Sequence, residues 1–124
     1  MKKLILATSV CLGISLPAYA DDMSWETTGK PVDICYAVQK NVRFLYNAWA
    51  NDAKDTYREV KVYMKQNLEG QGPEKAKLMA IYQTTLPKIE SGEFLPPKVE
   101  TRYVGNNKLQ QFAGAECFKA FTEK

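Results

Sequence analysis

Apolar and polar residues between Cys35 and Trp49 alternate with the period of an α-helix. The apolar positions recur in steps of three or four residues, and polar side chains occupy the directions between them. This stretch therefore predicts an amphipathic helix. We expect Asp33 to be its N-cap, because a carboxylate there accepts hydrogen bonds from the amides of the first turn. The apolar face consists of Cys35, Val38, Val42, Leu45 and Trp49.

The apolar period continues beyond this helix, but a single helix over the whole stretch would be too long for the domain, which argues for a break. No glycine or proline interrupts residues 32–69. One helix of that extent would be about 55 Å long, whereas a domain of this size has a radius of gyration of about 13 Å. We expect the polar segment 51–55 to separate two helices, with Asp55 as the second N-cap. The alternative is a single helix over residues 33–69, which leaves three long helices and an irregular loop.

Glycine and proline mark the ends of the elements that follow. Gly70 and Gly72 end the second helix, and Pro73 opens a third, because the first helical position needs no amide donor. Pro87 is expected to kink or end that third helix near its last turn, since proline cannot donate to the helical hydrogen bonds.

Residues 91–107 are the irregular part of the pattern, because glycine, proline and asparagine are dense there. Within this part, residues 99–104 alternate as in a strand, but a single strand cannot form a sheet, so we expect an ordered loop. Asn107 is the expected N-cap of a last helix, whose apolar face includes Cys117.

The first 20 residues have the composition of an export signal. Lys2 and Lys3 give a short positive start, residues 4–16 form an apolar run, and residues 18–20 read Ala-Tyr-Ala, a pattern that signal peptidase accepts. The run is shorter than the roughly 20 apolar residues that a membrane span needs. The expected domains are a cleaved signal peptide (1–20), a flexible polar lead that contains Trp25 (21–32) and a single helical domain (33–124). The expected location is the periplasm or the outside of the cell.

Cys35 and Cys117 are the two cysteines that remain after the predicted signal, which includes Cys11. Both lie on apolar helix faces, so their sulfur atoms point into one interior. An exported chain with two cysteines and no C-x-x-C spacing predicts one Cys35–Cys117 disulfide. Two buried thiols or an intermolecular bridge are the alternatives. We expect an all-α, small four-helix domain whose first and last helices are joined by this disulfide.

Composition excludes several classes of function. The 124-residue chain has no histidine, and its net charge of +3 falls to +1 without the two lysines of the predicted signal. A charge near zero gives no reason to expect a nucleic-acid partner. Nucleophilic sites of the Ser-His-Asp or Cys-His type are excluded, and no phosphate-binding loop, haem or metal motif is present. We expect no enzymatic activity, no cofactor and no metal.

Aromatic and basic side chains away from the apolar faces are the candidates for partner binding. Tyrosine is enriched in interface hot spots, a basic ridge along residues 54–65 can meet an anionic partner, and an apolar loop tip often binds. The competing interpretation is a solvated helix face, tyrosines at the edge of the core and a loop that folds over it. The candidate residues are Tyr36, Tyr46, Arg58, Lys61, Tyr63, Lys65, Phe94 and Tyr103.

These features favour a small exported, non-enzymatic protein that presents a rigid helical surface to a protein partner in the cell envelope. Inhibitors, immunity proteins and accessory subunits act in this way. One alternative is a carrier of a small apolar ligand between the helices. Another is an acid-stress chaperone of the periplasm. The plan of signal, polar lead, small helical body and one disulfide, with Lys30-Pro31-Val32 before the first mature cysteine, resembles the HdeA-type acid chaperones. The cysteine spacing departs from theirs, and the resemblance assigns no site residue.

Overall fold

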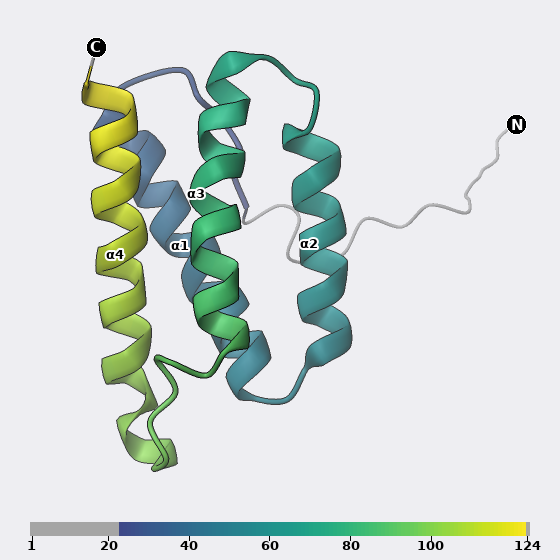
Figure 1. Ribbon diagram of the computed structural model, residues 1–124, viewed down its shortest axis with the longest axis vertical. Helices are drawn as coiled ribbons and strands as arrows, with labels where there is room; N and C mark the ends of the chain where they lie inside the picture. Colours follow the sequence, from purple (N-terminus) through teal and green to yellow (C-terminus); the bar gives the residue numbers. More distant parts are fainter. Residues whose placement is uncertain (1–22, 124) are drawn as a thin grey trace, which may run out of the picture.

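Four α-helices make up most of residues 23–123, the part of the chain that the computed structural model describes. They are α1 (Pro31–Ala50), α2 (Lys54–Leu68), α3 (Pro73–Glu90) and α4 (Arg102–Thr122), and a 3-10 turn, η2 (Val99–Thr101), precedes α4. Successive helices run in opposite directions (Figure 1). No strand occurs in this part of the chain, so the predicted all-α fold is confirmed. The predicted signal peptide lies outside the described residues.

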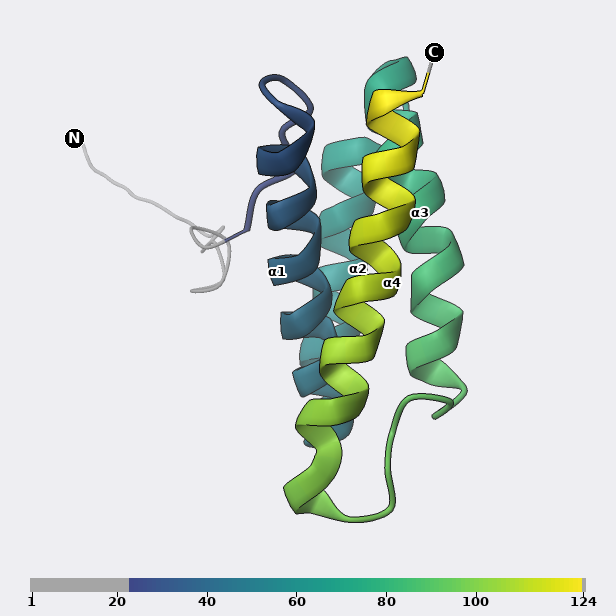
Figure 2. The same cartoon turned by 90° about the vertical axis from the view of Figure 1, so that its left-hand side faces the viewer.

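The helices pack as a ring of four. The most extensive contact joins α1 to α4, which lie side by side (Figure 2), and further contacts join α4 to α3, α3 to α2 and α2 to α1. Apolar and aromatic side chains from all four helices fill the centre, where burial removes their surface from water. The largest fully buried side chains are Tyr57, Tyr82, Leu45, Leu68, Leu78 and Leu109.

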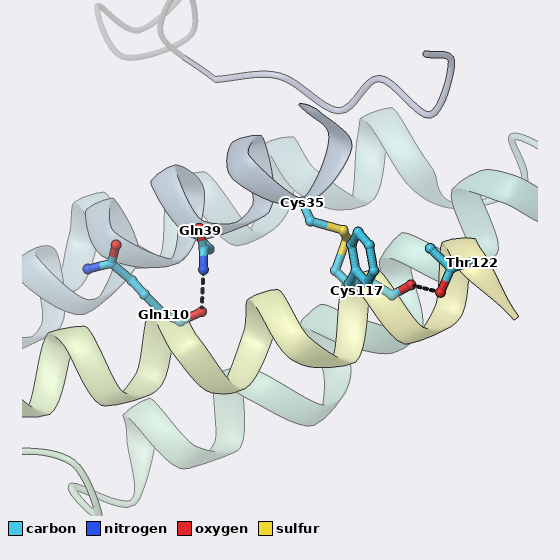
Figure 3. The surroundings of a disulfide bond; sticks show 6 residues. Cys35, Gln39, Gln110, Cys117 and Thr122 are labelled. Atoms are coloured by element: carbon cyan, nitrogen blue, oxygen red, sulfur yellow. Dashed lines mark hydrogen bonds between the residues drawn. A yellow bond between two sulfur atoms is a disulfide. The ribbon is translucent and has the colours of Figure 1, made fainter. Parts of the chain in front are cut away.

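A disulfide joins Cys35, near the start of α1, to Cys117, near the end of α4 (Figure 3). The two Cα atoms are 5.5 Å apart, and the two residues are 82 positions apart in the sequence. Both side chains are buried. The predicted pairing is confirmed, and it connects the two helices that share the largest contact.

The predicted break after the first helix is also confirmed, so residues 23–123 form four helices rather than three long ones. Asp52 adopts a positive φ of 64° there, and the amide of Ala53 donates to the carbonyl oxygen of Ala48 at 2.8 Å. The prediction that Asp55 is the N-cap is wrong. Asp55 lies inside the first turn of α2, where its carboxylate pairs with Arg58.

The first helix begins earlier than predicted, at Pro31, so Asp33 is not its N-cap. The carbonyl oxygen of Lys30 accepts the amides of Asp33 and Ile34 at 3.0 and 3.1 Å. Proline is favourable at this first position because its missing amide would have had no partner.

The fourth helix also begins before the predicted point, at Arg102, which places Asn107 inside α4 rather than at its cap. Residues 99–104 are helical and not a loop. The amide and the hydroxyl of Thr101 both donate to the carbonyl oxygen of Lys98, at 3.1 and 2.9 Å, and close the preceding 3-10 turn. Pro87 does not end α3, which continues to Glu90.

The polar lead is held on the helices at Trp25, which is only 5% exposed. The indole meets the rings of Tyr63 and Tyr82 edge to face, at centroid distances of 5.9 and 5.6 Å. Asn41 donates to the carbonyl oxygen of Ser24 at 3.0 Å. Lead residues 23–30 therefore cover the side of the bundle where α1, α2 and α3 meet.

Candidate partner-binding groove

The candidate residues fall into separate regions. Tyr46, Phe94 and Tyr103 come together where α1, the loop after α3 and the start of α4 meet. The basic candidates and Tyr63 lie on α2, which makes no contact with α4 within residues 23–123. Tyr36 lies near the start of α1, about 15 Å along the helix axis from Tyr46 at 1.5 Å per residue; it is 62% exposed.

The sequence suggests that Tyr46 lies at the surface, but the structure buries it. The residue is only 3% exposed. Its hydroxyl donates to the carbonyl oxygen of Phe94 at 2.6 Å and lies 3.3 Å from that of Arg102. Burial raises the pKa of Tyr46, and the charge of Arg102 lowers it by less, so the hydroxyl stays protonated as a donor. Tyr46 therefore holds the loop and α4 against α1.

Phe94 is half-buried and packs against the core, so the loop folds over the bundle and its phenyl ring is not an exposed tip. The reason is local: its carbonyl oxygen accepts the Tyr46 hydrogen bond, which pins the loop to α1. Tyr103, by contrast, is 65% exposed, and Val99 in η2 is 67% exposed. These two apolar side chains stand next to a groove.

The groove has a volume of about 350 Å³ and runs between the C-terminal half of α1 and the N-terminal half of α4. We call it the α1–α4 groove. From α1 and the residue that caps it, the groove is lined by Arg43, Tyr46, Asn47, Ala50 and Asn51. From η2 and α4 it is lined by Val99, Arg102, Tyr103, Asn106, Asn107 and Gln110.

Carboxamide side chains form a connected network along this groove. The Nδ2 amide of Asn106 donates to Oδ1 of Asn47 at 3.0 Å, and the Nε2 amide of Gln110 donates to Oδ1 of Asn106 at 2.9 Å. Asn106 is buried by this packing. The network bridges the two helices and fixes the position of the groove's polar floor.

Arg102 crosses from α4 to the end of α1. Its Nη1 atom donates to the carbonyl oxygen of Ala50 at 2.8 Å. Its Nε atom is buried and has no hydrogen-bond acceptor among residues 23–123. An unpaired buried donor is costly, so the packing of Arg102 against the end of α1 is maintained although this donor has no partner.

Most of the groove residues were not among the sequence candidates, although a signal for them exists. Arginine followed by two carboxamides recurs with a step of four as Arg43, Asn47 and Asn51, and again as Arg102, Asn106 and Gln110. A step of four places such residues on one face of a helix. The disulfide then sets the register: Asn47 lies 12 residues after Cys35, and counting the same distance back from Cys117 reaches Gly105, next to the observed partner Asn106.

Two of the three basic candidates on α2 are engaged in ion pairs within the molecule. Arg58 pairs with Asp55, and Lys61 lies 3.0 Å from the carboxylate of Glu90 on α3. Tyr63 is half-buried against Trp25. Lys65 is exposed. These side chains do not join the α1–α4 groove.

Glu90 ties α3 to α2 and makes stability depend on pH. Its Oε2 atom accepts hydrogen bonds from the hydroxyl of Tyr57 at 2.8 Å and from Lys61 at 3.0 Å. Partial burial raises the pKa of Glu90, but these two hydrogen bonds outweigh it and hold that pKa below its ordinary value of 4.5. A lowered pKa stabilises the fold at pH values above the ordinary one, and this contribution is lost as the pH falls through the folded-state value.

We expect Glu90→Gln to lower the free energy of unfolding at pH 7 by less than about 1 kcal/mol, since the carboxylate is partly exposed and screened. The difference between variant and wild type should shrink as the pH falls below about 4. Urea unfolding followed by circular dichroism between pH 3 and 7 measures this. The charge-matched control Glu116→Gln, on the exposed side of α4, should follow the wild-type profile; a constant deficit for Glu90→Gln at every pH would contradict the assignment.

Comparison with known proteins gives no match: no family model, no curated protein and no solved structure matches this chain. None of the helices between residues 23 and 123 has both the length and the apolar character to cross a bilayer. Within the same residues, no group of three or more acidic or cysteine side chains is placed to hold a metal ion. The disulfide indicates an oxidising compartment. Inference about function therefore depends on the groove and its surroundings.

Proposed function

We propose that this protein is a small exported, non-enzymatic binding protein whose protein partner docks across the α1–α4 groove. The observation that carries the proposal is the exposure of Tyr103 and Val99 beside this groove. Exposed tyrosine next to a concave surface is typical of a binding hot spot, because its ring supplies apolar area and its hydroxyl can still donate.

Rigidity of the groove supports the proposal. The disulfide fixes α1 against α4 at one end of their contact, and the Asn47–Asn106 hydrogen bond and the Tyr46 hydroxyl fix them at the other. A surface that is already ordered before binding loses little entropy when the partner arrives. Inhibitors, immunity proteins and accessory subunits of envelope complexes all benefit from this property.

The predicted signal at residues 1–20 and the disulfide together support a location in the periplasm or outside the cell. We do not favour a carrier of an apolar ligand, because large side chains such as Tyr57 and Tyr82 occupy the interior of the described bundle. Seven of the eleven residues that line the α1–α4 groove carry a carboxamide or a guanidinium group, and these groups suit a peptide surface better than an apolar ligand.

The test is a pair of matched substitutions at exposed sites on opposite helices. Tyr103→Ala should weaken capture of the envelope partner by about tenfold or more, as hot-spot truncation does, without changing the melting temperature. Val62→Ala, at an exposed apolar position on α2, should leave capture unchanged.

A photoreactive amino acid at position 103 should also crosslink a single partner in intact cells, whereas the same group at position 62 should not. Equal crosslinking at the two positions, or equal capture by Tyr103→Ala and wild type, would contradict docking at this groove.

A further inference from the structure

The α1–α4 groove carries positive charge without a facing carboxylate. Arg43 and Arg102 are its charged lining residues, and no Asp or Glu lines it among residues 23–123. Of the acidic residues near its ends in sequence, Asp52 lies 3.6 Å from Lys54. Glu100 belongs to η2 but does not line the groove. The groove therefore has the charge that an anionic group on a partner would complement.

Arg102 is already oriented for such a group. The hydrogen bond from its Nη1 atom to the Ala50 carbonyl oxygen holds the guanidinium in place at the end of α1, and its Nε donor lacks an acceptor in the described part of the chain. A guanidinium binds a carboxylate through short, charge-assisted hydrogen bonds that are stronger than neutral ones. A carboxylate docked at this position would supply the acidic partner that the lining of the groove lacks.

The two arginines stand at opposite ends of the groove. Arg43 belongs to α1 and Arg102 contacts Ala50, so the two arginines meet α1 at positions seven residues apart, or about 10.5 Å along the axis. An extended chain advances about 3.3 Å per residue, so this distance corresponds to three or four residues of an extended segment. Asn51 follows Ala50, and Asn107 comes directly after Asn106 on α4; both also line the groove. Their exposed carboxamides can each donate to and accept from a peptide backbone.

From these three features we infer, on the basis of the proposed function, that the partner's docking segment is an extended acidic peptide. Two of its carboxylate side chains, about four residues apart, bind Arg43 and Arg102, and its backbone lies on the exposed carboxamides of the groove. The inference names the chemistry that the groove recognises: a pair of carboxylates on one extended segment of a protein.

The experiment uses the mature protein and two short synthetic peptides of glycine and serine. One carries glutamates four residues apart, and the other carries glutamines at the same positions. Titrations followed by amide chemical shifts should place the acidic peptide at Asn47, Asn106 and Gln110, with an affinity about tenfold or more above that of the glutamine peptide. Binding of the acidic peptide should weaken as salt screens the charges.

Arg43→Gln is the decisive variant, because Arg43 is exposed and its replacement leaves the carboxamide network of Asn47, Asn106 and Gln110 in place. It should reduce affinity for the acidic peptide by about fivefold to tenfold, the size expected for one charge-assisted contact. Lys65→Gln on α2 removes the same charge elsewhere and should leave affinity unchanged.

Three results would overturn the inference: equal affinity for the two peptides, no binding of either, or an equal loss in Arg43→Gln and Lys65→Gln. The last would indicate a general charge effect. The outcome is separate from that of the proposed function: a partner that crosslinks at position 103 but binds Arg43→Gln as tightly as wild type would preserve the docking site and exclude the acidic segment.

Discussion

Replacement of both Cys35 and Cys117 by alanine is expected to lower the free energy of unfolding by about 3–5 kcal/mol. The bond joins residues that are 82 positions apart, so its removal releases most of the described chain, residues 23–123, in the unfolded state. Loop closure over such a length is the main source of disulfide stabilisation in the chain-entropy model. For a domain of this size, the loss corresponds to a fall in melting temperature of roughly 15–30 °C.

Thermal and guanidinium unfolding of the variant and of wild type measure the difference. Wild-type protein treated with a reductant is the matched control, since it loses the bond but keeps both sulfur atoms in the core, and it should unfold within about 1 kcal/mol of the double variant. A loss below about 1 kcal/mol in both would show that packing of α1 against α4 holds the bundle closed without the bond. Two reactive thiols in the denatured, unreduced protein would contradict the disulfide itself.

The sequence predicts the helices best where their apolar period is long. The apolar face from Cys35 to Trp49 identifies α1, and the polar segment 51–55 with its length argument identifies the break before α2. The cysteines identify α1 and α4 as neighbours, because a covalent bond between their apolar faces requires the two helices to lie side by side. These features can be predicted because they depend on local periodicity and on one long-range constraint, the disulfide, which the two cysteines indicate in the sequence.

The start of α4 could not be predicted from local signals, because tertiary packing overrides them. Gly105, Asn106 and Asn107 are weak helix formers, yet they lie within α4. Gly105 is buried beneath the carbonyl group of Phe94, and Asn106 is buried in its hydrogen bond to Asn47. Both contacts join segments far apart in sequence.

The burial of Tyr46 was missed for a similar reason. The apolar period predicts a single buried stripe on α1, but this helix packs against α4 on one side and against α2 and α3 on another. The buried arc is therefore wider than one stripe and includes Tyr46 and the polar Asn41. Asn41 is satisfied there by the carbonyl oxygen of Ser24 and by the hydroxyl of Tyr82, at 3.0 and 2.9 Å.

The groove could not be predicted without the register of α1 against α4. Its floor combines the residues of two helices, and neither set shows by itself that it faces the other. The pairing of Asn47 with Asn106 follows only after α1 and α4 are placed antiparallel at the disulfide. The exposure of Tyr103 beside the groove follows from the early start of α4, which the local signals concealed.

Gly105→Ala is expected to lower the free energy of unfolding by about 2–4 kcal/mol, although the same change in an unconstrained helix stabilises by about 1 kcal/mol. An added Cβ would lie 2.8 Å from the carbonyl carbon of Phe94 and from the hydroxyl oxygen of Tyr46, and closer still to the Phe94 carbonyl oxygen. Because that neighbour is backbone, the whole loop must move away from α4. The movement breaks the short hydrogen bond from Tyr46 to the loop and leaves its buried hydroxyl only the longer 3.3 Å contact with the carbonyl oxygen of Arg102.

Gly114→Ala, in the same helix, is the matched control. Its added Cβ would meet the side chain of Gln39, with Cδ at 2.9 Å, and that side chain can swing aside at the cost of its 3.2 Å hydrogen bond to the Gln110 carbonyl oxygen (Figure 3). The gain in helix propensity offsets this loss, so the change should stay within about 1 kcal/mol of wild type. Urea unfolding of the two variants shows whether glycine is required by the general closeness of α1 and α4 or by the Phe94 carbonyl group. If both cost the same, the close approach of α1 to α4 is the general constraint; if Gly105→Ala alone is costly, the Phe94 carbonyl group is what requires glycine at the edge of the groove.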